Sequence, residues 1–400
     1  MECVRKVTED IFWVGGNDRR LALFENVYPI PQGVSYNSYL IMDEKTVLTD
    51  GVDHAVTKQF FENVSALLKD RPLDYLIINH MEPDHAGSIA EIVKRYPEVT
   101  LVCNEKTKKM LSQFFAEDFQ IVTVGPKDTL CSGAHTFSFV MAPMVHWPEV
   151  MVTYDASAKV LFSADAFGTF GALEGHLFAD AMDFQTQWLP EARRYYANIV
   201  GKYGPSVQAL LKAASQLEIE AICPLHGPVI RKDFSLYLKA YQSWSTYTPE
   251  EEGVLIAYAS IYGNTENAAE VLAFELAQRG VRNIRVCDTA STHPSYLVAE
   301  AFRCSHLVFA AASYNSGLFD SMEILLNDLV HHNLQNRKVA LIENGSWAPS
   351  AGKKMTELVG QMKQMEMIAP LLTVRSSLKP EQKEEISAIA DAIAQCIGKE

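Results

Sequence analysis

The sequence predicts a protein of two domains that belong to the α/β and α+β classes. Three observations carry this prediction. The chain has 400 residues, which is too many for one ordinary hydrophobic core. Its first part mixes short strand patterns with helical ones, whereas strands and helices alternate regularly beyond residue 253. The polar stretch 245–252 lies between them without periodicity, so we expect domains at residues 1–248 and 253–400.

Composition and charge exclude several classes of partner. Hydrophobic residues make up 48% and charged residues 21% of the chain, as is typical of soluble globular proteins. The net charge of −14 argues against nucleic acid, because binding to phosphates needs a basic face. No apolar run approaches the roughly 20 residues of a membrane helix, and the first residues lack the apolar stretch of a signal peptide. Seven cysteines without a Cys-x-x-Cys pair indicate reduced thiols, so we expect a cytoplasmic protein with no membrane partner.

In the first domain, strand patterns come before, between and after three helical patterns. Apolar residues recur with helical spacing over about 54–69, which predicts an amphipathic helix. The other expected elements are, in order, a hairpin of 36–42 and 46–50, a buried strand at 73–79, a helix to about 96, a strand at 99–103, a helix at 105–116 and several strands over 119–141.

The segment His80-Met81-Glu82-Pro83-Asp84-His85 concentrates two imidazoles and two carboxylates directly after a buried strand. It precedes a helical pattern, so the backbone is held from both sides. His80 and Glu82 alternate and share one face in extended chain. Asp84 and His85 lie past the turn and point to a neighbouring position. The spacing therefore predicts two adjacent metal ions.

Three further residues follow apolar runs in the same way, namely His146, Asp165 and His226. Each of them alone is more typical of a structural role, as a hydrogen-bonded core histidine or a helix N-cap. Because sites form at the carboxyl ends of strands, their recurrence predicts that they meet the first cluster. Tyr195 and Tyr196 are weaker candidates for a place at the same pocket.

This pattern resembles the metallo-β-lactamase fold, an αββα sandwich of two sheets with helices outside. Hydrolases of that fold have histidine at the position of Glu82, whereas the flavodiiron proteins have glutamate. By position, the resemblance implies one iron on His80, Glu82 and His146, a second iron on Asp84, His85 and His226, and Asp165 as the bridge. The ligand types alone also suit zinc, and a zinc pair would imply hydrolysis.

The second domain is expected to be a doubly wound parallel sheet. Its first turn, 260–265, leaves a strand and opens a helix, so hydroxyls and free N–H groups form an anion cradle. The turn lacks both the triphosphate and the dinucleotide motif and contains no lysine or arginine, which favours one phosphate monoester. His306 and the other histidines of this domain are expected to be solvated. Strands are expected near 253–259, 282–287, 306–311, 338–342 and 368–374, and helices near 265–279, 295–303, 320–332, 351–365 and 380–397.

Two more loops, 313–317 and 344–347, follow predicted strands and offer N–H groups and an aromatic side chain to a flat ring. The whole of residues 253–400 resembles flavodoxin. The resemblance implies FMN, with its phosphate on Ser260, Tyr262, Gly263, Asn264 and Thr265. Its isoalloxazine would lie against Ser313, Tyr314, Asn315, Ser316, Gly317, Asn344, Gly345, Ser346 and Trp347.

Together the two domains resemble the flavodiiron proteins, or A-type flavoproteins, in a form without the rubredoxin or reductase extensions of some members. The resemblance implies an oxidoreductase in which FMN relays electrons from an external donor, such as rubredoxin or a reduced deazaflavin, to a non-haem diiron site. That site would reduce dioxygen to water, nitric oxide to nitrous oxide, or both. The implied assembly is a head-to-tail homodimer or a dimer of dimers. The alternatives are a dinuclear zinc hydrolase with a flavin sensor domain, and an electron carrier whose first domain is a scaffold.

Overall fold

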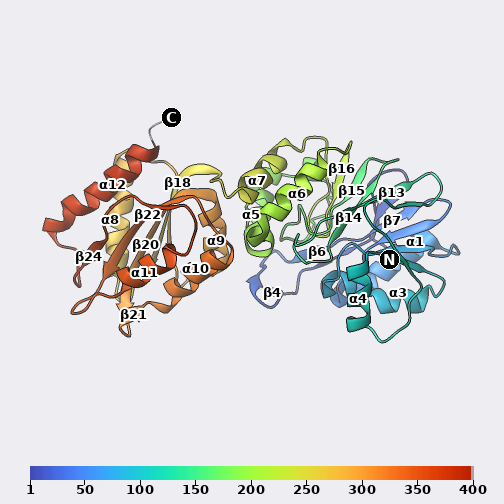
Figure 1. Cartoon of the computed structure of the whole chain (residues 1–400), viewed down its shortest axis with the longest axis horizontal. Coiled ribbons are helices and arrows are strands. Elements are labelled where there is room, and N and C mark those ends of the chain that lie inside the picture. The colour runs from blue at the N-terminus through green and yellow to red at the C-terminus, as the bar shows by residue number, and fades with distance from the viewer. Residues whose placement is uncertain (398–400) are drawn as a thin grey trace. The chain divides into compact units, whose positions relative to one another are not determined.

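The structure, a computed structural model, describes residues 1–397 and divides into two compact units (Figure 1). The first comprises Met1–Tyr196 and Tyr203–Tyr241, and the second comprises Ala197–Lys202 and Gln242–Glu400. Within residues 1–397, no helix is both long and apolar enough to cross a membrane. The domain limits expected from the sequence stay a prediction.

The first unit is built on two sheets that pack through their apolar faces. One has the strand order β1-β2-β7-β8-β9-β10-β11 and the other β12-β13-β14-β15-β16-β17. The strands of the first are Arg5–Lys6, Ile11–Trp13, Tyr39–Met42, Thr46–Thr49, Tyr75–Ile77, Thr100–Cys103 and Ile121–Thr123. Those of the second are Thr129–Cys131, Thr136–Met141, Met151–Asp155, Val160–Phe162, Ala221–Cys223 and Ile230–Arg231.

The core of this unit lies between the two sheets. Trp13 and Tyr39 from the first sheet pack with Phe137, Phe139 and Phe162 from the second. In β13 the buried phenylalanines alternate with half-buried residues, because successive side chains of a strand point to opposite faces. The expected two-sheet sandwich is therefore present.

Short strands and seven α-helices complete the unit. Two small ribbons pair β3 (Gly16–Asp18) with β6 (Val34–Tyr36) and β4 (Leu23–Phe24) with β5 (Tyr28–Pro29). The helices are α1 (Thr57–Leu68), α2 (Pro83–Ala86), α3 (Ile89–Arg95), α4 (Glu105–Phe114), α5 (Leu189–Tyr195), α6 (Gly204–Ala214) and α7 (Ser235–Ser245), the last of which continues into the second unit.

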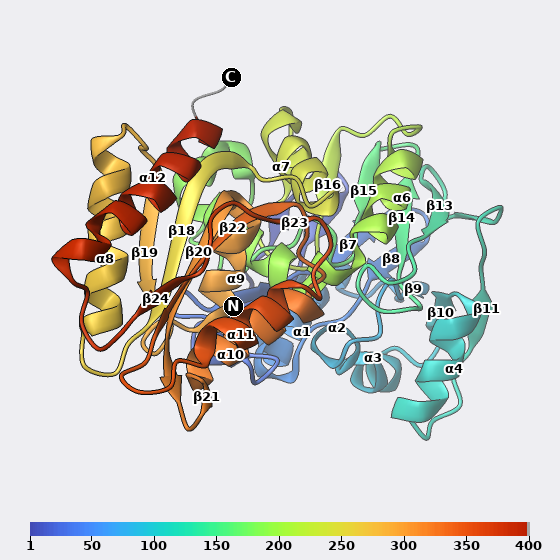
Figure 2. The same ribbon diagram turned by 60° about the vertical axis from the view of Figure 1, so that its left-hand side comes forward.

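The second unit contains a parallel sheet of order β19-β18-β20-β22-β23, with β24 also paired to β22. Helices α8 and α12 lie on one face and α9, α10 and α11 on the other (Figure 2). The strand order is 2-1-3-4-5, which is one of the orders of a doubly wound sheet, the predicted architecture. The strands are β18 (Glu251–Ala259), β19 (Ile284–Asp288), β20 (Cys304–Tyr314), β21 (Gly317–Leu318), β22 (Arg337–Asn344), β23 (Met365–Met367) and β24 (Leu372–Val374). The helices are α8 (Asn264–Gln278), α9 (Pro294–Arg303), α10 (Asp320–His331), α11 (Ala351–Val359) and α12 (Lys383–Ile397).

Two expectations for this unit were wrong. The strand predicted near 368–374 is shorter, since only β24 lies in that range, and a separate strand, β23, precedes it and pairs with an earlier part of β22. His306 is not solvated, because β20 begins at Cys304 and carries His306 into the sheet, where it is 2% exposed. Its Nδ1 atom lies 2.8 Å from the Ser305 hydroxyl.

Candidate functional site

The segment 80–85 lies at the carboxyl end of β9 and runs into α2, which begins at Pro83. Proline suits this first helical position because its missing N–H would have no partner there. On the neighbouring strand end, the Asp50 carboxylate accepts the backbone N–H of Asn79 at 2.7 Å and of His80 at 3.2 Å. These two hydrogen bonds fix the backbone at the start of the segment 80–85.

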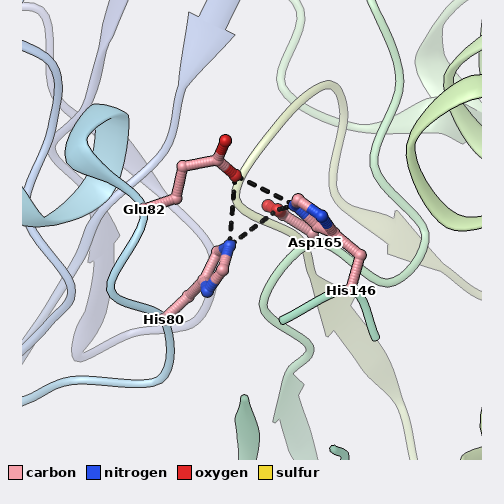
Figure 3. Close-up of side chains that lie close together, drawn as sticks. All are labelled: His80, Glu82, His146 and Asp165. Atoms are coloured by element: carbon pink, nitrogen blue, oxygen red, sulfur yellow. Dashed lines mark hydrogen bonds and ion pairs between the residues drawn. The ribbon is translucent and has the colours of Figure 1, made fainter. Parts of the chain in front are cut away.

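Four of the predicted residues converge in a first cluster (Figure 3). His80 and Glu82 come from the loop after β9, His146 from the β13–β14 connection and Asp165 from the turn after β15. The His146 Nε2 atom lies 2.9 Å from Glu82 Oε2 and 3.1 Å from Asp165 Oδ2. One ligand atom from each of the four lies within 4.8 Å of the others, so they could hold one metal ion.

Asp84, His85 and His226 form a second cluster beside the first. The Nε2 atoms of His85 and His226 lie 3.1 Å apart, and Asp84 Oδ2 lies 3.4 Å from the former and 3.3 Å from the latter. Asp165 Oδ1 lies 3.3 Å from His85 Nε2, while its Oδ2 atom faces the first cluster. The structure thus brings all seven predicted residues together, with Asp165 between the two clusters.

The electrostatics of the site are those of an anionic pocket suited to cations. Both oxygens of Asp84 and Oδ1 of Asp165 are buried and have no hydrogen-bond donor among residues 1–397. Burial opposes ionisation of Asp165, yet the adjacent His80 and His85 hold its pKa well below the usual range. Buried charges are costly unless they are paired or coordinate metals. Imidazoles and carboxylates without thiolates suit iron, manganese or zinc.

Two groups that sequence analysis missed orient the imidazoles. Glu149 Oε1 accepts a hydrogen bond from His80 Nδ1 and from the Met81 N–H, both at 2.9 Å. The Ser35 carbonyl accepts from His226 Nδ1 at 2.8 Å. Each bond turns Nε2 toward the cluster, which is the arrangement of metal-binding histidines. No sequence motif marks Glu149 or Ser35, because each is far along the chain from its histidine and meets it only in the folded structure.

The residue after His226, Gly227, sets the direction of the backbone at this histidine. Gly227 has a φ of 79°, and a Cβ there would lie 2.1 Å from the Thr169 Cγ2 atom. Only glycine therefore allows the chain to turn back directly after His226.

Aromatic side chains shield the second cluster from solvent. The ring centroids of Phe24 and Tyr195 lie 5.3 and 5.5 Å from that of the His226 imidazole. The Phe170 ring packs against Tyr195, with 5.1 Å between the ring centroids. The Tyr195 hydroxyl is buried without a hydrogen-bond partner within residues 1–397. Burial, and then the charge of Asp165, raise its pKa well above the usual value, so it keeps its proton. Tyr195 reaches the pocket, whereas Tyr196 packs against Tyr241 at 5.1 Å.

Glu25 is a further carboxylate at the site, and sequence analysis did not single it out. It lies in the turn between β4 and β5, where it is exposed at the surface. The charge of Glu82 acts on its carboxyl group.

A second candidate site is a cavity of about 500 Å³ at the carboxyl ends of β18, β20 and β22. Gly263 has a φ of 84° and donates its N–H to Ser260 Oγ at 3.1 Å, which turns the chain into α8 at Asn264. This turn directs the free N–H groups of a helix N-terminus at the cavity. The lining residues include no lysine or arginine.

Most of the residues predicted to bind a flavin line this cavity, and three do not. Gly263 forms the turn, and Tyr314 packs on Phe319 at 5.6 Å, while Gly317 pairs with Tyr314 across β20 and β21. The predicted lining residues are Ser260, Tyr262, Asn264, Thr265, Ser313, Asn315, Ser316, Asn344, Gly345, Ser346 and Trp347, and the additional ones are Ile261, Ala312, Ala348, Pro349, Ser350 and Ser376. Tyr262 and Trp347 are 90% and 89% exposed.

Comparisons with known proteins agree with this geometry. The family model described as ODP family beta lactamase matches residues 34–227. An uncharacterized protein of Methanocaldococcus jannaschii is 31% identical over 321 residues, which cover 79% of each chain. An anaerobic nitric oxide reductase flavorubredoxin of Pectobacterium carotovorum is 30% identical over 85% of this chain and 68% of the relative.

Among solved structures, the rubredoxin oxygen:oxidoreductase of Desulfovibrio gigas superposes with a TM-score of 0.91 at 26% identity, covering 99% of this chain and 98% of the other. The match extends over both units. The predicted fold class, a metallo-β-lactamase-like sandwich followed by a flavodoxin-like sheet, is therefore confirmed.

Proposed function

Because the chain belongs to the flavodiiron protein family, we propose that it is an oxidoreductase that reduces dioxygen to water, nitric oxide to nitrous oxide, or both. One observation carries the proposal. Seven buried or nearly buried imidazoles and carboxylates form two adjacent clusters, and the two oxygens of Asp165 face one cluster each. This is a donor set for a metal pair that shares one carboxylate.

The residues present fit the cofactors of the family, FMN and a non-haem diiron centre. The unpaired oxygens of Asp84 and Asp165 need cationic partners. The cavity of the second unit has the volume of a small-molecule site, and the N-terminus of α8 suits one phosphate. When bound, the flavin and the iron pair supply the electrons with which the gas is reduced.

The chain's own side chains prepare this chemistry. Glu149 and the Ser35 carbonyl hold His80 and His226 in the tautomer that leaves Nε2 free. Phe24 and Phe170 keep bulk water away from the second cluster, where the substrate is an apolar gas. Tyr195 holds a proton at its buried hydroxyl beside the same cluster. This protonated hydroxyl can donate a hydrogen bond within the pocket.

We propose an external redox protein or cofactor, such as rubredoxin or a reduced deazaflavin, as the electron donor. We also propose a head-to-tail homodimer, or a dimer of dimers, in which each flavin lies beside the metal pair of the other chain. Tyr262 and Trp347 support a partner at the rim of the flavin cavity, since large exposed aromatics are typical of interaction surfaces. The seven cysteines are all free, which suits the reducing cytoplasm.

Metal analysis, a visible spectrum and gas consumption on the purified protein test the proposal. Two irons and one FMN per chain, with reductive consumption of dioxygen or nitric oxide, are the expected result. Two zinc ions with esterase activity would instead support a hydrolase with a flavin sensor domain. FMN without metal would support an electron carrier.

A further inference from the structure

The turn after β15, residues 163–168, carries Asp165 between the two metal clusters. Its backbone is left-handed at two positions, with a φ of 51° at Ala164 and of 65° at Phe167. Residues other than glycine adopt this region at a steric cost, and such strain persists only where the surrounding structure holds it. Because Asp165 lies between the two strained residues, the contacts that hold the turn also determine where its carboxylate points.

Two tyrosines of α7 bind this turn through their hydroxyls. The Tyr237 hydroxyl donates to the Phe167 carbonyl at 2.9 Å and to the Gly168 carbonyl at 3.0 Å. The Tyr241 hydroxyl accepts a hydrogen bond from the Phe167 N–H. Both tyrosines are buried. Since an unpaired backbone group is costly away from water, these hydroxyls stabilise the turn in its observed conformation.

The same tyrosine rings pack on the turn. The Tyr241 ring stacks on that of Phe167, with 4.4 Å between the ring centroids, and the Tyr237 ring meets Phe167 edge-on at 5.7 Å. A further aromatic side chain, Tyr195, contacts the turn, because a Cβ at Gly168 would lie 2.9 Å from its Cε1 atom. The turn is therefore in close contact with α7 and with Tyr195, which restricts its movement.

We propose that Tyr237 and Tyr241 are positioning residues of the metal pair, which fix the turn so that the two oxygens of Asp165 face one cluster each. The inference rests on the proposed function, in which two ions share Asp165. Its Oδ2 atom lies 3.1 Å from His146 Nε2, and its Oδ1 atom lies 3.3 Å from His85 Nε2. A rotation of the turn would move one of these oxygens away from its cluster. The tyrosines act through the backbone of the turn and not as ligands of the ions.

Metal titration of the full chain tests the inference. Tyr237→Phe and Tyr241→Phe each remove one hydroxyl and keep the ring. The metal-free proteins are titrated anaerobically with Mn²⁺, with free Mn²⁺ measured by electron paramagnetic resonance, and separately with Fe²⁺. We expect each variant to bind the weaker of the two ions about tenfold less tightly than the wild type, as the loss of outer partners typically does. Each variant is an independent test, so the other suffices if one does not fold.

The matched control is Tyr154→Phe in β14. The Tyr154 hydroxyl is likewise bonded to a backbone carbonyl, that of Glu218, at 2.6 Å. All three variants should lower the melting temperature of the metal-free protein, because each loses one hydrogen bond. Tyr154→Phe should leave both metal-binding steps unchanged.

The resonance signal of the bound ions separates positioning from general stability. Two Mn²⁺ ions that share a carboxylate are magnetically coupled, so their signal differs from that of isolated ions. Only Tyr237→Phe and Tyr241→Phe should weaken the coupled signal. If both variants bind two coupled ions as tightly as the wild type does, the inference fails and the proposed function stands. If the wild type itself does not bind two coupled ions, both fail.

Discussion

Asp165 shows how one side chain can serve two clusters. It is fully buried, and its two oxygens face His146 on one side and His85 on the other. His146, by contrast, contacts only the first cluster. The two residues should therefore respond differently to substitution.

We expect Asp165→Asn to weaken both bound metals by at least about tenfold, because a neutral amide leaves excess positive charge at each. His146→Ala should lower occupancy of one metal and abolish gas reduction while FMN remains bound. Iron content and flavin absorbance of the two purified variants check this. One iron at full occupancy with near-normal turnover in Asp165→Asn would contradict a bridging role.

His306 gives a pH prediction that is independent of the metal site. Burial, and then the nearby Lys338, lower its pKa to about 4, so the native state holds it neutral. An unfolded histidine titrates near 6.5. Between these values the unfolded state binds a proton that the native state does not, so stability is complete above about pH 6.5 and decreases as the pH falls toward 4.

Thermal unfolding of wild type and His306→Gln at pH 7 and pH 5 measures this contribution. The melting temperature should fall further between pH 7 and pH 5 in the wild type than in the variant, since glutamine cannot take up the proton. Equal losses in the two proteins would show that His306 does not contribute to acid sensitivity.

At the scale of elements, the turn from β18 into α8 is the part of the cavity that we propose for a phosphate. It offers the hydroxyls of Ser260 and Thr265 and the N-terminus of a helix, and the cavity-lining residues include no lysine or arginine. Affinity must therefore come from hydrogen bonds. A bond to a charged group contributes roughly 1.5–3 kcal/mol, so each hydroxyl has a measurable share.

The double variant Ser260→Ala, Thr265→Ala should bind FMN more than about tenfold more weakly than the wild type. The dissociation constant comes from fluorescence titration of the flavin-free protein. Ser376→Ala, also at the cavity but away from this turn, is the matched control and should have a smaller effect. An unchanged constant in the double variant would place the phosphate elsewhere.

At the scale of the whole molecule, the proposed electron transfer is between chains. Closed two-fold dimers are the commonest soluble assemblies, and a head-to-tail pair would bring each flavin to the other chain's metals. Transfer between chains allows two inactive variants to complement each other in a mixed dimer, whereas transfer within one chain does not.

Two inactive variants should restore activity when they are co-expressed with different affinity tags. One lacks metal, through His80→Ala with His146→Ala, and the other lacks flavin, through Ser260→Ala, Asn264→Ala and Thr265→Ala. A purified mixed dimer has one intact flavin site and one intact metal site on different chains. Turnover of roughly half the wild-type rate per dimer is expected, since one of two pathways is complete. Mixed dimers that carry both cofactors without turnover would exclude transfer between chains.

The sequence by itself determined the alternation of strands and helices in the second unit, the seven residues that gather at the two metal clusters and most of those that line the cavity, while the two-sheet sandwich followed from the family resemblance. These are local signals, because apolar runs mark strands and polar residues directly after them mark the sheet edge. The segment 80–85 carries four of the seven clustered residues, and the other three each follow an apolar run.

Only the tertiary structure decided how these residues are held. Glu149 and His80 are 69 positions apart, and Ser35 and His226 are 191 apart, so no spacing in the chain relates them. The burial of His306 likewise follows from where β20 begins. The hydrophobic pattern specifies which face of a strand or helix a residue lies on. The orientation of the site's side chains depends on contacts that form only when distant segments pack together.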